Sequence, residues 1–207
     1  MLDIRKPIPD FSLPDEDGRL VTKASLKGKR FVLYFYPKDS TPGCTTQACG
    51  FRDEQPAFGK LGVPVFGISA DTVASHRRFA DKQSLNFRLL ADPERQLIEG
   101  LGAWGEKTLY GRKYMGILRC TFVVDASGRV EQVWPKVDVK THAADVRRYL
   151  MGESTASAAS VVPAKKAVAK APAKAAPKAA AKRASKAPVK KAAVKKAQVA
   201  RSTSRKA

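Results

Sequence analysis

The sequence predicts an α/β domain, built on a central mixed sheet flanked by helices, that is followed by a disordered basic tail. Short apolar runs alternate with longer stretches of helical spacing, which is typical of α/β proteins. Every Phe, Tyr, Trp, Leu and Ile of the 207 residues lies within the first 150. Because only that part can bury a core, we expect one domain over residues 1–151 and a tail over residues 152–207.

The expected strands are short apolar segments. Residues 30–36, RFVLYFY, are too few for a helix and too uniformly apolar for a surface strand, so they indicate a buried central strand. Similar runs lie in the segments PVFGISAD and RLLAD, and a fourth covers residues 120–125. The Ser-Gly turn that follows leads into the alternating segment RVEQVW, which indicates a hairpin and argues against a purely parallel sheet. Between the strands we expect helices over residues 45–59, 72–84, 93–101 and 141–151.

Charge is distributed unevenly along the chain. Its 39 Lys and Arg against 19 Asp and Glu give a net charge of +20. Residues 1–150 hold 24 basic and 18 acidic residues, a net +6, and the last 57 hold 15 and 1, a net +14. Those 57 residues contain no aromatic residue, Leu or Ile, so burial cannot offset the entropy of ordering them. This pattern excludes a protein of two globular domains.

Two further classes are unlike this sequence. No apolar run approaches the roughly 18 residues that span a bilayer, and the start MLDIRKPIPDF lacks the apolar stretch of a secretory signal. We therefore expect a cytoplasmic protein without membrane contact. Its three cysteines, Cys44, Cys49 and Cys120, are too few for a disulfide scaffold. In a reducing compartment, closely spaced cysteines are more often catalytic or metal-binding.

Cys44 occupies a junction between a strand and a helix. The loop PKDSTPGC follows the central strand, and the next residues have helical spacing. Catalytic groups gather at the carboxyl ends of such strands, and a helix N-terminus favours a thiolate over a thiol. The helix end alone supplies too little stabilisation, so a second positive group is needed. Arg119 is the candidate, because it begins a strand that can lie beside the central one. Thr41 can hydrogen-bond an oxygen substrate above the sulfur, and Pro37 stiffens the loop.

The alternatives at this point are a structural cysteine pair and half of a metal site. A zinc site requires four ligands, commonly Cys pairs with His partners. Only His76 and His142 are available, and both lie in helical segments where we expect ordinary surface residues. The residues alone therefore favour a catalytic Cys44 without excluding the other two interpretations.

The run FYPKDSTPGCTTQACGFRD resembles the active-site segment of the peroxiredoxins, specifically the bacterioferritin comigratory protein or Q-type subfamily. The Pro-x-x-x-Thr-x-x-Cys signature of that family stands here as Pro37, Thr41 and Cys44, and Arg119 in LRCTFVVD matches its arginine. The resemblance covers roughly residues 3–150. It implies a thioredoxin-like fold and a thiol peroxidase that requires no metal, haem or flavin.

The resemblance also implies roles for the site residues. Cys44 would attack hydrogen peroxide or an organic hydroperoxide and become a sulfenic acid, while Thr41 and Arg119 hold the two peroxide oxygens. Cys49 would be the resolving cysteine of an intramolecular disulfide that thioredoxin reduces, in a monomeric protein. Five residues of α-helix rise about 7.5 Å, and disulfides need Cα atoms within about 6.8 Å, so the helix must unwind first.

Two residues depart from the usual pattern of the family. Gln47 stands where Glu is common, so a carboxylate that could orient the arginine is replaced by an amide. Cys120 stands where Ser or Thr is usual. We expect Cys120 to be a small buried strand residue, and the alternative is an additional redox partner.

The tail is a Lys-Ala-Pro repeat that resembles the tails of linker histones. Its composition predicts non-specific, salt-dependent contacts to DNA phosphates, which would hold the protein near the nucleoid. The alternatives are a solvated charged linker and an anionic membrane surface. The alternative to a peroxidase is that the whole chain is an architectural DNA-binding protein whose thiol domain is weakly active or regulatory. Lysines recur every four residues at Lys166, Lys170, Lys174, Lys178, Lys182, Lys186 and Lys190.

Overall fold

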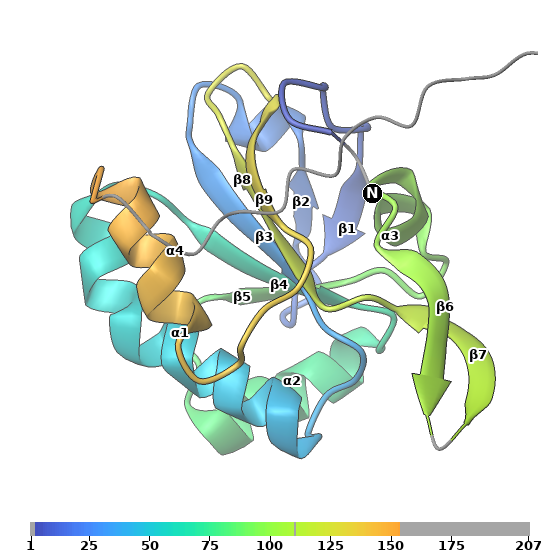
Figure 1. The fold of residues 1–207 in the computed structure, drawn as a ribbon. Helices are drawn as coiled ribbons and strands as arrows, with labels where there is room; N and C mark the ends of the chain where they lie inside the picture. The colour runs from blue at the N-terminus through green and yellow to red at the C-terminus, as the bar shows by residue number, and fades with distance from the viewer. Residues whose placement is uncertain (1–2, 110, 154–207) are drawn as a thin grey trace, which may run out of the picture. The chain divides into compact units, whose positions relative to one another are not determined.

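The computed structural model describes residues 3–109 and 111–153. In this part of the chain the main sheet has five strands in the order β5-β4-β3-β8-β9 (Figure 1). β3, β4 and β5 are parallel, whereas β8 runs antiparallel to β3 and β9 antiparallel to β8. The predicted mixed sheet and its C-terminal hairpin are therefore confirmed. The strands are β3 (Phe31–Phe35), β4 (Val65–Ser69), β5 (Arg88–Ala91), β8 (Cys120–Val124) and β9 (Val130–Trp134).

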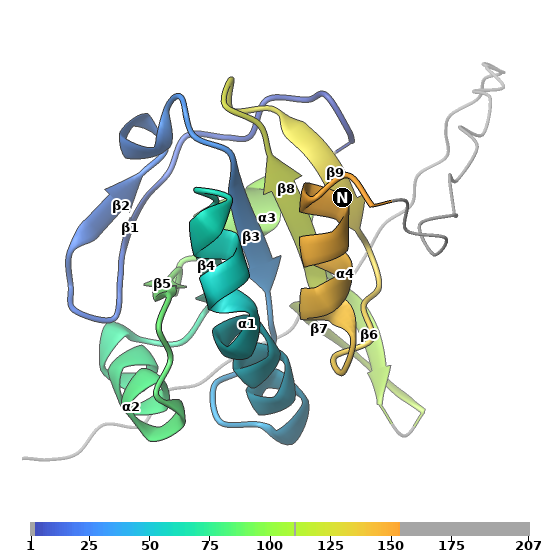
Figure 2. The same ribbon diagram turned by 90° about the vertical axis from the view of Figure 1, so that its left-hand side faces the viewer.

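Helices cover both faces of this sheet. α1, α2 and α4 lie on one face and α3 on the other (Figures 1 and 2). Alternate side chains of a strand point to opposite faces, so Phe31 and Leu33 of β3 join one core while Val32 and Tyr34 join the other. This explains why residues 30–36 are apolar throughout. The helices are α1 (Pro42–Lys60), α2 (Val73–Gln83), α3 (Gln96–Gly100) and α4 (His142–Leu150).

Several short elements were not predicted from the sequence. The strands of the first hairpin have three residues each, which is too few for a periodic pattern, and the start of β7 is exposed, so it has no apolar alternation. The second hairpin projects from the body of the domain (Figure 2). These elements are β1 (Ser12–Pro14), β2 (Leu20–Thr22), the 3₁₀ turn η1 (Ala24–Leu26), β6 (Trp104–Leu109) and β7 (Arg112–Ile117).

The helix predicted over residues 93–101 is shorter than expected, since α3 begins only at Gln96. Arg95, immediately before it, has a left-handed backbone with φ 59°. The buried carboxylate of Asp92 accepts hydrogen bonds from the backbone N–H groups of Gln96, Leu97 and Ile98 at 2.9–3.0 Å. These bonds satisfy the first turn and fix where the helix starts.

The predicted helix at residues 45–59 begins three residues earlier, at Pro42. Proline suits the first position of a helix, because it has no N–H to leave unpaired. A second proline, Pro56, lies inside α1 and deprives the Arg52 carbonyl of its helical donor. The side-chain amide of Asn86 donates to that carbonyl instead, at 3.2 Å. The long helix is therefore kept continuous past Cys44 and Cys49.

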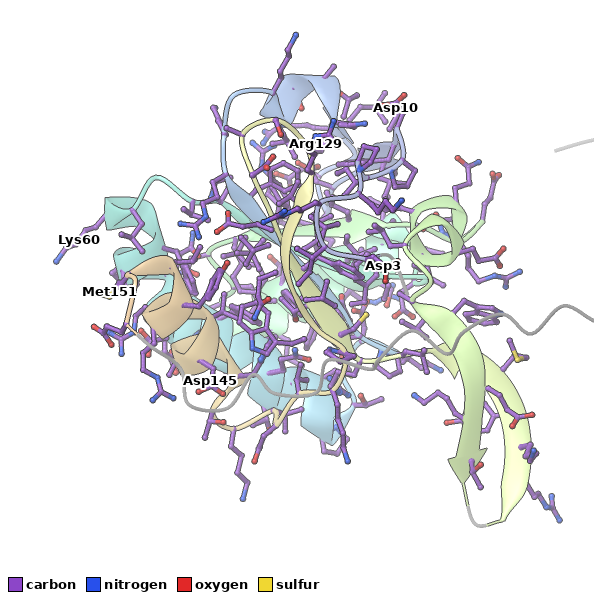
Figure 3. All side chains as sticks on the ribbon, turned by 45° about the horizontal axis from the view of Figure 1, so that its top comes forward. Asp3, Asp10, Lys60, Arg129, Asp145 and Met151 are labelled. Carbon is purple, nitrogen blue, oxygen red and sulfur yellow. The ribbon has the colours of Figure 1, made fainter. Side chains whose placement is uncertain are left out.

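α1 and α4 pack side by side on the sheet. Gly50 of α1 faces Ala143 of α4, and a Cβ built on Gly50 would be in ordinary contact with Cβ of Ala143, at 3.5 Å. Lys60 and Met151 mark the carboxyl ends of the two helices, which point the same way (Figure 3). Among the described residues no helix is both long and apolar enough to cross a membrane. The predicted tail, with its repeated lysines, lies outside the described residues apart from positions 152 and 153, so its boundary and its disorder remain predictions.

Candidate active site

The sheet brings Arg119 beside the loop that precedes α1. Phe35, the last residue of β3, pairs with Cys120, the first residue of the antiparallel β8. Arg119 therefore adjoins the carboxyl end of β3, from which residues 37–41 lead into α1. Thr41 is the N-cap residue of this helix, with an extended backbone. Strand pairing thus joins two segments that are 75 residues apart in the chain.

Cys44 is the third residue of α1, and its side chain is only 2% exposed. The Arg119 guanidinium donates from Nη2 to the Cys44 sulfur at 3.2 Å and from Nη1 to Oε1 of Gln47 at 2.6 Å. The guanidinium also passes close to Gly43, where a Cβ would lie in ordinary contact, 3.5 Å from Nη2. The amides of a first helical turn have no intrahelical acceptors, so they add to the positive field around the sulfur. Hydrogen-bond donors thus surround the sulfur, an arrangement that suits a nucleophile.

Gln47 orients Arg119, although it is an amide where the family commonly has the carboxylate of Glu. Its side chain is 1% exposed, and its amide oxygen accepts the Arg119 hydrogen bond. An amide can therefore hold the guanidinium without adding a negative charge that would compete with the sulfur for it. Its Nε2 has no hydrogen-bond partner among the described residues.

The other predicted site residues lie in the loop and one turn further along the helix. Pro37 and Thr41 are half-buried. The Thr41 hydroxyl donates to the Lys38 carbonyl at 3.1 Å and makes no capping bond to the helix. Cys49 is half-buried, and its thiol faces Oε1 of Gln83, at the end of α2, at 3.7 Å. All three cysteines are free, and α1 is helical from Cys44 through Cys49.

Cys120 is fully buried in β8, as expected for a small strand residue. Burial raises the pKa of its thiol to about 12. The thiol therefore stays protonated near neutral pH, and thiols in this state are poor nucleophiles. This environment does not suit an additional redox partner.

The expectation that both histidines are surface residues is wrong. His76 is 0% and His142 1% exposed, because the apolar faces of α2 and α4 carry them against the sheet. Nε2 of His142 lies 2.7 Å from the Thr121 hydroxyl, and burial lowers the pKa of this histidine to about 4. In the described part of the chain, no three His, Cys, Asp or Glu side chains gather as a metal ion would require.

Lys107 of β6 is a basic residue near the site that sequence reasoning missed. Its half-buried ammonium group donates to the Ile117 carbonyl at 3.0 Å. Burial lowers its pKa, the charge of Arg119 lowers it further, and Cys44 acts in the opposite direction. The sequence around Lys107 has no apolar alternation, so it could not show that this lysine lies near Arg119. Its position depends on how the hairpin of β6 and β7 folds.

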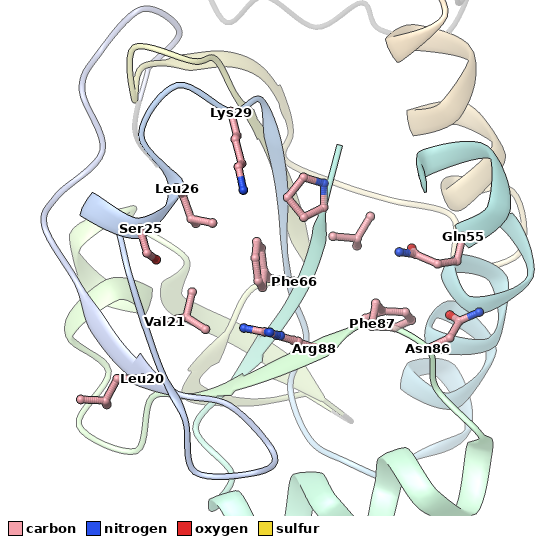
Figure 4. Close-up of a pocket in the computed structure, with 12 residues that line it drawn as sticks. Leu20, Val21, Ser25, Leu26, Lys29, Gln55, Phe66, Asn86, Phe87 and Arg88 are labelled. Atoms are coloured by element: carbon pink, nitrogen blue, oxygen red, sulfur yellow. The ribbon is translucent and has the colours of Figure 1, made fainter. Parts of the chain in front are cut away.

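A pocket of about 450 Å³ lies away from Cys44 (Figure 4). Phe66 near the start of β4, together with Phe87 and Arg88 at the start of β5, lines it on the sheet side. The parallel strands place Cys44 at their carboxyl ends and this pocket at their amino ends. It is therefore separate from the thiol site.

Comparisons with known proteins give the same family. Residues 4–133 match the AhpC/TSA family. The peroxiredoxin Bcp of Escherichia coli (strain K12) is 48% identical over 134 residues, which are 65% of this chain and 86% of that protein. A putative peroxiredoxin bcp of Coxiella burnetii is 46% identical over 145 residues, 70% of this chain and 96% of that protein.

Solved structures agree with these relatives. A structure of the Xanthomonas campestris bacterioferritin comigratory protein, which reduces alkyl peroxides, superimposes with a TM-score of 0.68 at 38% identity over 72% of this chain and 98% of that chain. A cysteine-to-serine mutant of Xylella fastidiosa PrxQ gives a TM-score of 0.70 at 31% identity over 73% of this chain and 97% of that one.

The fold and these relatives are those of a peroxidase. The chain belongs to the AhpC/TSA family and, within it, to the Bcp/PrxQ peroxiredoxins. The thioredoxin-like fold and the family that the active-site segment predicted are thereby confirmed.

Proposed function

We propose that Cys44 is the nucleophile of this peroxidase and that it acts on hydrogen peroxide and organic hydroperoxides. The observation that carries the proposal is the hydrogen bond from Arg119 to the buried Cys44 sulfur. A thiolate held at a helix N-terminus beside a fixed guanidinium is both more abundant and better placed than a free thiol. The alkyl peroxide reduction of the Xanthomonas campestris relative supports the inclusion of organic substrates.

The reaction proceeds by displacement at oxygen. The Cys44 thiolate attacks the terminal peroxide oxygen, a sulfur–oxygen bond forms and the O–O bond breaks. The departing oxygen takes a proton and leaves as water or an alcohol, while Cys44 becomes a sulfenic acid. Arg119 and Thr41 orient the two oxygens, and Arg119 stabilises the negative charge that develops on the leaving one.

Cys49 is proposed as the resolving residue. Its thiol displaces water from the sulfenic acid and forms a disulfide with Cys44. Because α1 is intact between the two residues, its first turns must unwind before the sulfurs can meet. Unwinding breaks the contacts of Arg119 with Cys44 and Gln47 and releases Cys49 from Gln83. Thioredoxin then reduces the disulfide by thiol–disulfide exchange.

Mass spectrometry of peroxide-treated full-length protein tests these assignments. One equivalent of hydrogen peroxide should link Cys44 to Cys49 and leave Cys120 as a thiol. The Cys49→Ser variant should stop at a Cys44 sulfenic acid. A linkage through Cys120, or oxidation spread over the three cysteines, would contradict the proposed roles.

The tail is proposed to bind DNA without sequence preference and to hold a monomeric, cytoplasmic peroxidase near the nucleoid. Only its composition supports this: a net charge of +14 after residue 150 and no aromatic residue for base stacking. A gel shift at low salt compares the full chain with a chain ending at Glu153. Retardation of DNA by the full chain alone supports the proposal, and equal mobility with both chains refutes it.

A further inference from the structure

A buried polar cluster lies beside the active-site loop, residues 37–41. Its centre is Asp39, which is 6% exposed. The carboxylate of Asp39 accepts hydrogen bonds from the Tyr36 hydroxyl at 2.8 Å and from the Ser75 hydroxyl at 2.7 Å, and Nδ1 of His76 lies 2.9 Å from Oδ2. One group just after β3 and two groups of α2 therefore contact a single carboxylate of the loop.

Both ring nitrogens of His76 face hydrogen-bond acceptors in this arrangement. Its Nδ1 faces the carboxylate of Asp39, and its Nε2 lies 3.2 Å from the Leu90 carbonyl oxygen. Both oxygens can only accept hydrogen bonds, so both ring nitrogens are assigned as donors. Burial alone would raise the pKa of Asp39, but the hydrogen bonds from His76, Ser75 and Tyr36 bring it below its ordinary value. The two side chains form a hydrogen-bonded pair shielded from water.

The main chain of the loop is held at the same place. The backbone N–H of Asp39 donates to Oδ2 of Asp71 at 2.8 Å, and the Ser69 hydroxyl donates to the same oxygen. Ser40, the next residue, has a left-handed φ of 58°, which is uncommon for a residue other than glycine. Such a conformation costs about 1 kcal/mol or more and persists only where the surroundings fix it. Asp39 on one side and the N-cap Thr41 on the other supply that constraint.

We propose that Asp39 and His76 are positioning residues for the peroxidase reaction. The contact between them ties the loop to α2 and, through the Leu90 carbonyl, to β5. The loop in turn sets where Pro37 and Thr41 stand relative to Cys44. The titratable groups that face the pair are Tyr36 from β3's end and Asp71 from the end of β4, whose carboxylate holds the Asp39 amide. The effect of this hydrogen-bonded pair is expected in the geometry of the loop. The proposal rests on Cys44 being the reacting thiol.

Two reaction rates of Cys44 separate positioning from general structural damage. In full-length protein carrying Cys49→Ser, one reaction is oxidation by hydrogen peroxide, followed by trapping of the sulfenic acid, and the other is alkylation by iodoacetamide. Peroxide needs the aligned loop, whereas iodoacetamide reports only the thiolate and its access. Asp39→Asn and His76→Gln should each slow oxidation about tenfold or more and alter alkylation less than about threefold. The double variant should be oxidised no more slowly than the slower of the two single variants, because both substitutions break the same interaction.

Asp81→Ala is the matched control, since it removes an exposed ion pair with Arg77 on the same helix and should change neither rate. Ser75→Ala removes a single hydrogen bond to Asp39 and serves as the test if the Asp39 and His76 variants do not fold. It should slow oxidation by peroxide, to a smaller extent than those variants, and leave alkylation unchanged. Unchanged oxidation in the folded variants, or an equal loss in both reactions, would overturn the positioning role. A wild-type Cys44 that reacts with peroxide no faster than free cysteine would instead refute the proposed function itself.

Discussion

Arg119 donates one hydrogen bond to the Cys44 sulfur and another to Gln47, so a single planar guanidinium fixes the position of both side chains. The sequence predicted Cys44 and Thr41 from the spacing of a family signature, and Arg119 from the segment LRCTFVVD that resembles the family. It could not show that Gln47 would serve as the acceptor. That role depends on Gln47 lying one turn after Cys44 on the buried face of α1, which only the packed helix reveals.

Arg119→Lys should slow the oxidation of Cys44 by peroxide about tenfold or more, because an ammonium keeps the charge but cannot span the sulfur and the amide oxygen together. Stopped-flow peroxide consumption measures the rate. Arg129→Lys is the control, since Arg129 (labelled in Figure 3) is exposed in the turn between β8 and β9, at the opposite end of β8 from Arg119. A lysine variant that keeps the wild-type rate would show that charge alone is sufficient.

The strands and the helices were predicted from sequence features of different kinds. The apolar runs predicted the central strands, and helical spacing predicted α1, α2 and α4. The start of α3 was predicted too early, because the hydrogen bonds from its first amides to Asp92 fix where the helix begins. The short hairpins were not predicted, because they depend on tertiary contacts. The buried histidines were missed because a lone His in an amphipathic segment gives no sign of which face it occupies.

His142 should make α4's packing sensitive to acid. Burial lowers its pKa from 6.5 to about 4, with Asp145 opposing the shift and Arg119 adding to it. Below pH 6.5 the unfolded chain takes up a proton that the folded chain accepts only near pH 4. The free energy of unfolding should therefore fall as the pH drops through this window, by about 3 kcal/mol from this group.

Urea unfolding of wild type and His142→Gln at pH 7 and pH 4 measures this contribution. Other titrating groups are shared by both proteins and cancel in the comparison. The wild type should lose more stability than the variant between the two pH values. Equal losses would show that His142 takes up its proton in the folded state as readily as in the unfolded chain.

The whole molecule divides its charge between a peroxidase domain with a net +6 and a tail with a net +14. Composition alone predicts this division, since every Phe, Tyr, Trp, Leu and Ile lies within the first 150 residues. In a relative, 145 aligned residues make up 96% of the protein, so a chain of about this domain's length is complete there. The last turn of α4 is closed within the domain, where the Glu153 amide donates to the Arg148 carbonyl at 3.0 Å.

A chain that ends at Glu153 should therefore keep both the unfolding free energy and the peroxide rate of the full chain, while losing salt-sensitive binding to DNA. Binding by the full chain should weaken with a log-log slope of about −0.9 per phosphate neutralised. Thermal unfolding, peroxide consumption and a salt titration measure the three properties. Loss of peroxide turnover on truncation would assign the tail a part in the enzymatic reaction.

The most direct test of the account is the second-order rate constant for hydrogen peroxide with the full chain, compared with that of free cysteine at the same pH. Complete ionisation of a thiol raises its reactivity only about 30-fold near neutral pH, so a larger factor requires that the site also orient the peroxide. We expect the wild type to exceed this limit and Cys44→Ser to abolish the reaction. A rate within the limit, or one that survives in Cys44→Ser, would contradict the account.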